Sequence, residues 1–214
     1  MTISTLTQKE LIYHVDMGVK AVLTVPTLEA ALKEQGITPD KAKKGLELIK
    51  EANLWQGRQD DTLENAQKAQ RTLKHVRDSI EAIYRRHRIA ARFVYREDEV
   101  MFKKLQLKGK RKMRYTDWLD QIQKFYTHLD AEAVVQFGIL PKEVSEVKKL
   151  LGQLSELNVL RNDARRQTHQ ATEAKQKALA DLRQWFSRFM RVAELACQDD
   201  PQLLEAMGIT VAAR

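Results

Sequence analysis

The sequence predicts an all-α protein, an elongated helical bundle of two tandem short-helix/long-helix repeats. Antiparallel, coiled-coil-like long helices with pseudo-two-fold symmetry are part of this prediction. The first observation is that the 214 residues include only 8 glycines and 4 prolines, too few for a turn-rich sheet protein. The second is that Leu, Ala, Lys, Arg, Glu and Gln, all good helix formers, dominate the composition. The third is that the segment Gly36–Pro39 returns as Gly138–Pro141, 102 positions later.

The repeat extends without a gap over about seventy residues, which is long enough to define a structural unit. Apolar positions that recur 102 residues later are Ala42 with Val144, Gly45 with Val147, Ile80 with Leu182, and Phe102 with Leu204. We therefore expect a first repeat at 1–107, a basic connector at 108–113 and a second repeat at 114–214, together forming one intertwined structural domain.

Each repeat is expected to begin with a short helix that ends at a glycine. The first short helix covers roughly 5–35, with an interruption near Pro26, and the second covers 114–137, where Trp118, Ile122, Phe125 and Leu129 form an apolar stripe. Gly36, Gly138 and Gly208 each precede an isoleucine and follow an apolar residue four positions earlier. This pattern predicts a positive φ at the glycine, with the isoleucine folding back in a Schellman-type cap.

The long helices are expected at 39–97 and 141–198, each with a proline in its first turn. Apolar residues spaced alternately by three and four form a seam at both ends of each helix, whereas the middles are polar or alanine-lined. We expect a dumbbell with two thin, antiparallel helices in its middle. The alternative is a break near Gly57 and a compact bundle; continuity is favoured because mid-helix glycine costs only about 1 kcal/mol.

An acidic turn follows each long helix. Asp98 and Asp200 are expected to be the N-caps of a last short helix in each repeat, with Pro201 at the first helical position of the second. Because the turns recur beside cap positions, we interpret their carboxylates as caps and not as acid/base or metal groups.

No recognisable catalytic, cofactor or metal pattern emerges. A carboxylate three residues before a histidine, as in di-iron bundles, is absent from the sequence, and Lys108-Gly109-Lys110 lacks the rest of a phosphate-binding loop. His87 falls on the apolar seam opposite Phe189, and Cys197 lies near a seam end, so both are expected in the core. An enzyme or cofactor binder with a site in the bundle core remains the weakest alternative.

The segment 68–114 carries 16 Lys and Arg against 5 Asp and Glu, an excess of 11 in a chain whose net charge is +8. Such density either marks a solvated helix face or binds an anionic partner, whether nucleic acid or an acidic protein. Phe102 is expected to point inward, so a base-stacking platform is not predicted. The candidate binding residues are Arg85, Arg86, Arg88, Arg92, Arg96, Lys103, Lys104, Lys108, Lys110, Arg111, Lys112 and Arg114.

No stretch approaches 18 apolar residues, and the start of the chain lacks the pattern of a signal peptide. The single cysteine excludes an internal disulfide. These observations predict a cytoplasmic protein with no membrane contact.

The stretch Gln202–Ile209, following Arg183-Gln184-Trp185-Phe186, resembles the C-terminal part of uncharacterised bacterial all-helical proteins. The resemblance covers about the last thirty residues and implies no activity, cofactor or site. From the residues themselves we expect a non-enzymatic structural or protein-interaction protein, with self-association as one form of it. The alternative is a nucleic-acid-binding protein that uses residues 85–114.

Overall fold

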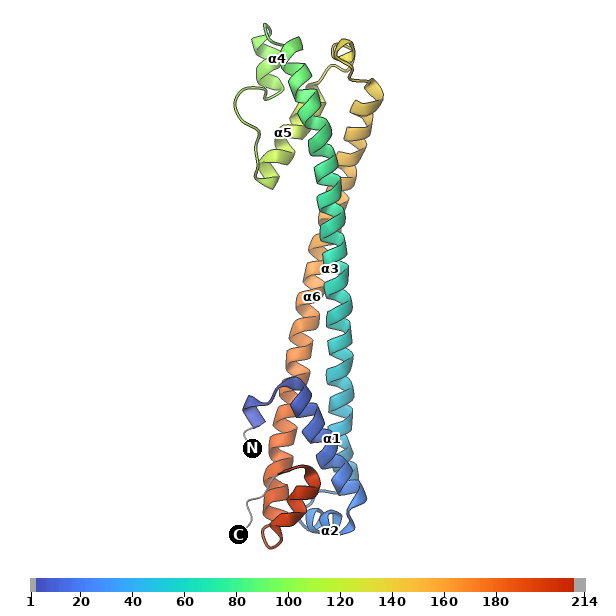
Figure 1. Cartoon of the computed structure of the whole chain (residues 1–214), viewed down its shortest axis with the longest axis vertical. Coiled ribbons are helices and arrows are strands. Elements are labelled where there is room, and N and C mark those ends of the chain that lie inside the picture. The colour runs from blue at the N-terminus through green and yellow to red at the C-terminus, as the bar shows by residue number, and fades with distance from the viewer. Residues whose placement is uncertain (1–2, 210–214) are drawn as a thin grey trace. The chain divides into compact units, whose positions relative to one another are not determined.

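The computed structural model describes residues 3–209, and every regular element within that range is helical, which confirms the all-α class (Figure 1). In chain order the elements are η1 (Ile3–Thr5), α1 (Gln8–Thr24), α2 (Pro26–Glu34), α3 (Pro39–Val94), α4 (Glu99–Lys104), α5 (Tyr115–His128), η2 (Val135–Phe137), α6 (Pro141–Ala196) and η3 (Pro201–Met207). The α elements are α-helices and the η elements are 3-10 helices.

The chain divides into two compact units. Unit 1 takes its described residues from 3–64 and 166–209, and unit 2 is Asn65–Arg165. The division falls inside α3 and α6 and not at the connector 108–113. Each unit therefore combines part of α3 with part of α6.

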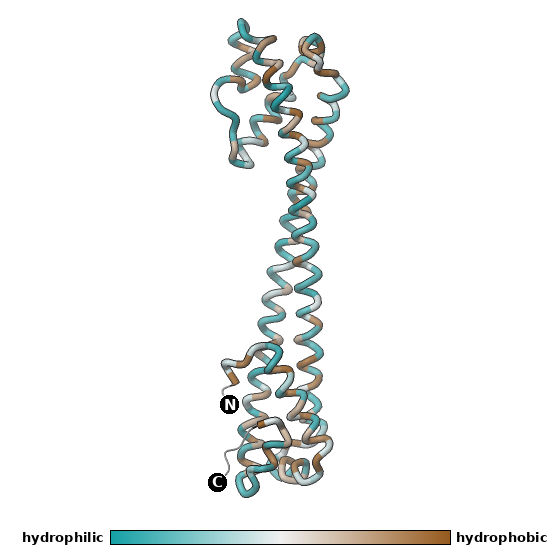
Figure 2. The backbone as a smooth tube through the Cα atoms, in the orientation of Figure 1, coloured by the Kyte–Doolittle hydropathy of each residue, from teal (hydrophilic) through white to brown (hydrophobic). Residues whose placement is uncertain are grey.

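Both long helices are continuous, and each contains 56 residues. The expected continuity of α3 through Gly57 is confirmed, and a Cβ at that glycine would meet no atom within 4 Å. Away from the short helices, α3 and α6 are mainly hydrophilic, with isolated hydrophobic positions (Figure 2).

Within unit 1 the two long helices run antiparallel, because contacts further along α3 are made with positions earlier in α6. In unit 1, Gly45 meets Trp185, and the side-chain amide of Gln59 donates to the Thr172 hydroxyl at 3.0 Å. The Thr168 hydroxyl donates to the Thr62 carbonyl, also at 3.0 Å. The sequence predicted only small apolar contacts here, so these polar bonds, which fix the pairing register, are an addition from the structure.

The core of unit 1 forms where α1, α2 and η3 cover the seam of α3 and α6. Leu11, Val15 and Val19 on α1 are fully buried, as is Leu182 on α6. Thr7 begins α1 with a capping box in which its hydroxyl accepts from the Glu10 amide and its own amide donates to the Glu10 carboxylate. The interruption near Pro26 is confirmed, because Pro26 starts α2 directly after Val25 ends α1.

The core of unit 2 is richer in aromatic residues. The predicted stripe on α5 is buried, and Tyr84 of α3 packs edge-on against Phe125 with ring centroids 5.1 Å apart. The prediction that this helix reaches 137 is wrong, because α5 ends at His128. The Asp130 carboxylate accepts from the amides of Glu132 and Ala133, so the side chain stabilises a turn in place of another helical turn.

The predicted positive φ is confirmed at all three glycines, with +80° at Gly36, +77° at Gly138 and +75° at Gly208, although Gly138 ends η2 and not α5. At two of them the next amide bonds back five residues, Ile37 to Leu32 and Ile209 to Leu204. The structure adds one stop that the sequence did not reveal. Gln106 adopts a φ of +51°, and the Leu107 amide donates to the Phe102 carbonyl at 3.1 Å.

The two predicted acidic caps differ. The Asp98 carboxylate accepts from the Met101 amide at 2.9 Å, which confirms its capping role before α4. Asp200 is the N-cap of η3, with Pro201 at the first helical position as predicted, but its side chain makes no cap bond. The segment after Asp200 is a 3-10 helix, in which the amides are placed differently from those of an α-helix.

Candidate interaction surface on unit 2

Five of the twelve candidate binding cations have structural partners within unit 2. Glu81 is the first centre: it pairs with Arg85 and Arg111 and accepts the Trp118 indole N–H at 2.7 Å. Glu143 is the second, because it pairs with Arg86. The ion pairs with Arg111 and Glu143 join α3 to the connector and to α6, and the Trp118 hydrogen bond joins α3 to α5, so these side chains serve the fold.

Arg88 and Arg92 bind backbone carbonyls and not carboxylates. Arg88 donates to the carbonyls of Leu107 and Gly109 at 3.2 and 2.9 Å, and Arg92 donates to the same two carbonyls. Arg88 is 7% exposed, and burial lowers the pKa of its guanidinium. The two arginines hold the start of the connector against α3 while their charges stay uncompensated by any acidic partner in the described contacts.

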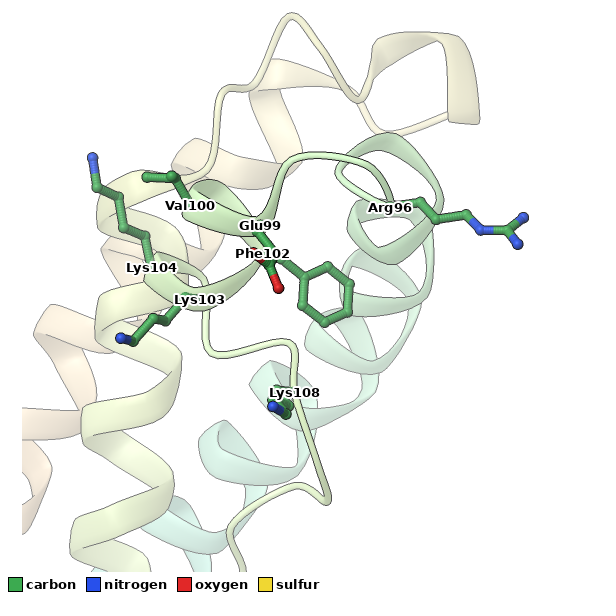
Figure 3. A pocket seen from close by; sticks show the side chains of 7 residues that line it. All are labelled: Arg96, Glu99, Val100, Phe102, Lys103, Lys104 and Lys108. Atoms are coloured by element: carbon green, nitrogen blue, oxygen red, sulfur yellow. The ribbon is translucent and has the colours of Figure 1, made fainter.

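The remaining candidate cations are exposed and have no ion pair among residues 3–209: Arg96, Lys103, Lys104, Lys108, Lys110, Lys112 and Arg114. Four of them line an open cleft of about 1040 Å³ together with Glu99, Val100 and Phe102. Figure 3 shows the Phe102 ring projecting into the middle, with Val100 and Lys104 on one side and Arg96 extending on the other. Phe102 is half-buried and packs against the core of unit 2, so it points inward as expected, but its ring also lines the cleft.

Four exposed apolar residues form a surface that sequence reasoning missed; we call Ile89, Phe93, Phe137 and Leu140 the apolar patch. Their side chains are 61%, 66%, 46% and 55% exposed. Ile89 and Phe93 are four residues apart on α3, and the ring of Phe93 stacks on Phe137 with centroids 6.5 Å apart. Arg86 lies three residues before Ile89 and Glu143 three residues after Leu140, so their ion pair links the two segments that carry the patch.

Leu140 occupies a position where leucine does not help the fold. Its carbonyl accepts the first helical amides of α6, which makes it the N-cap, yet its side chain has no oxygen to accept an orphan N–H. Thr38 stands at the matching position before α3, and its hydroxyl accepts from the Lys41 amide at 3.4 Å. The exposed leucine therefore replaces a stabilising polar residue, and the fold supplies no reason for the replacement.

His87 lies behind this surface in the core, as expected. It is fully buried, its Nδ1 is 3.0 Å from the Tyr126 hydroxyl, and its Nε2 is 3.6 Å from Glu143. Burial lowers the pKa of His87, although Glu143 opposes that shift. The pKa of Glu143 is lowered as well, mainly because Arg86 hydrogen-bonds its carboxylate. The imidazole is therefore held neutral as part of the packing.

The other residues considered for chemistry have structural surroundings. Cys197 is buried in the core of unit 1, and burial raises the pKa of its thiol. Among residues 3–209 no group of three or more His, Cys, Asp or Glu side chains is placed to hold a metal ion. No helix in the same range combines the length and apolar character that crossing a membrane requires.

The two units differ in charge. Unit 2 contains 22 Lys and Arg against 13 Asp and Glu, a net charge of +9, whereas unit 1 contains 15 against 16, a net charge of −1. The basic cleft and the apolar patch both belong to unit 2. An anionic partner would therefore be attracted to the unit that also exposes apolar side chains.

No protein-family model, curated protein or solved structure matches the chain. The resemblance of the C-terminal stretch to bacterial helical proteins therefore stays a prediction.

Proposed function

We propose that this is a non-enzymatic protein-interaction protein that binds its partner through the apolar patch on unit 2. The observation that carries the proposal is Leu140, an exposed leucine at an N-cap position three residues after Phe137, whose ring stacks on the exposed Phe93. Contiguous exposed apolar residues on a folded unit are typical of docking sites, because water contact with them is unfavourable. A role in docking explains why the cap position carries a leucine.

The test compares three forms of the full chain as baits in lysate from its host. The patch variant is Ile89→Ser with Phe93→Ser, and the control is Leu195→Ser, which removes a similarly exposed apolar residue (56%) from unit 1. We expect a partner retained by the wild type and the control but lost by the patch variant. Sedimentation of the three purified proteins tests whether self-association also depends on the patch. The proposal would be contradicted if all three forms retained the same partners and sedimented with the same mass.

A second candidate function is nucleic-acid binding through residues 85–114, favoured by the seven exposed cations and the net charge of unit 2. Fluorescence anisotropy with DNA and RNA oligonucleotides, between about 50 and 200 mM salt, tests it, since phosphate contacts weaken steeply over that range. Changing Lys103, Lys104, Lys108 and Lys110 to glutamine should remove binding. Changing Lys33, Lys43, Lys50 and Lys177 in unit 1 is the control. Absence of affinity at low salt would exclude this function.

We further propose that the chain is a tandem duplication with pseudo-two-fold symmetry. Support comes from the bounds of α3 and α6, which are offset by 102 residues at both ends. The stops at Gln106 and Gly208 have the same offset and the same backbone hydrogen bonds. Superposing unit 1 on unit 2 in an experimental structure tests this proposal, and unrelated helix packing in the two units would refute it.

A further inference from the structure

We infer that the partner presents an acidic amphipathic helix, whose apolar side contacts the apolar patch and whose carboxylates contact the cations of the basic cleft. The inference rests on the proposed function and adds the chemistry of the partner. It combines two features of unit 2, one apolar and one cationic, which are linked along the chain because Arg96 of the cleft follows Phe93 of the patch by three residues.

The arrangement of the patch residues indicates that the partner presents an apolar stripe along a helix. Ile89 and Phe93 lie on one stretch of α3, whereas Phe137 ends η2 and Leu140 lies in the turn between η2 and α6. A patch formed by a helix and a neighbouring turn has apolar groups on two sides. A helix with apolar residues at three- and four-residue spacing presents a matching stripe.

The cationic half follows from the cleft. Arg96, three residues after Phe93, lines the cleft together with Lys103, Lys104 and Lys108, and Glu99 is its only acidic lining residue in the described structure. None of these four cations has an ion pair among residues 3–209. Carboxylates on the polar side of a docked helix would supply the missing counter-charges and accelerate the encounter.

Charge also argues against a second copy of this chain as the occupant. Two patches meeting face to face would bring together two units of net charge +9, which repel each other. A copy docking through unit 1, with its net charge of −1, would offer little attraction. The positive charge of unit 2 attracts an acidic partner, whereas it repels unit 2 of a second copy.

The geometry also favours a peptide over a nucleic acid. The patch side chains other than the two phenylalanines are aliphatic, and Phe93 and Phe137 already stack on each other. A nucleic acid would use the lysines and leave Ile89 and Leu140 in water. A partner helix covers both groups at once.

The experiment is selection from a displayed library of random peptides of about 16 residues, about four helical turns, on the wild-type full chain. Binders that also bind the Ile89→Ser/Phe93→Ser variant are removed by counter-selection. We expect the retained peptides to carry apolar residues at helical spacing with Asp and Glu between them. Synthetic copies should lose about tenfold or more in affinity for Phe93→Ser, as at a central contact residue. They should keep full affinity for the Leu195→Ser control.

The affinity of the peptides and its dependence on salt are then measured with a charge variant. Changing Lys103, Lys104 and Lys108 to glutamine should lower the affinity and make it depend less on salt, since the change removes the attracting charges. Retained peptides that lack acidic residues, or an absence of patch-dependent peptides, would overturn the inference. So would displacement of the peptides by a single-stranded RNA that itself binds independently of Phe93, or a wild-type dimer that Phe93→Ser dissociates.

The inference and the proposed function fail separately. If the lysate experiment finds a patch-dependent partner while the library yields only neutral or basic peptides, the function stands and the acidic helix is wrong. If neither experiment distinguishes the patch variant from the wild type, both are wrong.

Discussion

The bounds of α3 and α6 are offset by 102 residues, yet positions 102 residues apart in the two units present different side chains to water. At the end of α6 in unit 1, the positions matching the apolar patch hold Arg191 and Leu195, and around the start of α3 they hold Gln35 and Thr38. Of these only Leu195 is apolar, whereas all four patch residues in unit 2 are. The difference teaches that helix packing constrains the buried side of these elements and leaves their exposed side free to specialise. Swapping residues between matched positions therefore separates folding from function.

The largest expected effect concerns Gly45 in unit 1, where a Cβ would lie 2.6 Å from the Trp185 ring. The matched pair in unit 2 is Val147 and Ile83, both packed in its core. We expect Gly45→Val to lower the free energy of unfolding by about 2 kcal/mol through overpacking. Trp185→Ile should cost a similar amount, about 2 kcal/mol, through a cavity.

The double variant Gly45→Val/Trp185→Ile should recover at least about 1 kcal/mol of the summed loss, because each change relieves the other. Hydrogen exchange of unit 1 peptides and chemical denaturation measure it. Gly57→Val is the control, since a Cβ there meets nothing within 4 Å. Strictly additive losses would mean that the two positions do not share a packing layer.

The next effect is a pH dependence confined to unit 2, where His87 occupies the position that Phe189 occupies in unit 1. The folded pKa of His87 is lowered, so the unfolded chain binds the proton more readily. The contribution of neutral His87 to the free energy of unfolding is therefore fully present above the unfolded pKa of about 6.5. It decreases as the pH falls below that value, by at most about 1.4 kcal/mol per pH unit. Tyr126, Glu143 and Arg86 are the ionisable groups that face the ring.

The comparison variant is His87→Phe/Tyr126→Phe, which removes the imidazole and the hydroxyl that would lose its partner. We expect it to abolish the loss of unit 2 stability between about pH 7 and 5, the range in which an unfolded histidine titrates. The Glu143 contribution is lost only at lower pH, below its ordinary value of 4.5, because its folded pKa is lowered. Equal pH profiles for variant and wild type would contradict a buried neutral His87.

The third swap exchanges the residues before α3 and α6. Leu140→Thr should raise the free energy of unfolding by about 0.5–1 kcal/mol, because a hydroxyl can accept an orphan amide. Thr38→Leu should lower it by about as much, 0.5–1 kcal/mol. If the patch is a docking site, Leu140→Thr also weakens partner binding while it stabilises the fold. A loss of stability in Leu140→Thr would refute the view that this leucine is retained for function.

The smallest effect exchanges Gln106 and Gly208, which end matching short helices with φ of +51° and +75°. Gln106→Gly should stabilise unit 2 by about 0.5 kcal/mol, because glycine adopts this conformation without a Cβ clash. Gly208→Gln should destabilise unit 1 by about 1 kcal/mol for the same reason. Thermal denaturation resolves the signs, and a destabilised Gln106→Gly would show that the glutamine side chain matters more than the backbone.

Much of the fold followed from local patterns. The capping at Gly36, Gly138 and Gly208, the prolines that open α3 and α6, and the seam spacing each depend on residues a few positions apart. The stripe on α5 was predicted for the same reason. The end of α5 was not, because the turn at Asp130 competes with a helix of similar local preference.

The candidate site was predicted only as a charge excess. Counting cations could not reveal that Arg88 and Arg92 bind the carbonyls of Leu107 and Gly109, nor that Glu81 engages two more. The one local signal for the patch was that Leu140 precedes α6 at the position where Thr38 precedes α3. It becomes informative only when an exposed Phe93 and Phe137 are found beside it.

By itself the sequence determined an all-α chain, the starts and stops of its long helices and the location of its excess charge, because these depend on backbone preferences and on composition. Only the tertiary structure decided which cations are engaged, and that Phe93 and Phe137, 44 residues apart, stack into one exposed surface. Contacts between distant segments depend on the packing of the elements between them, which no short pattern encodes.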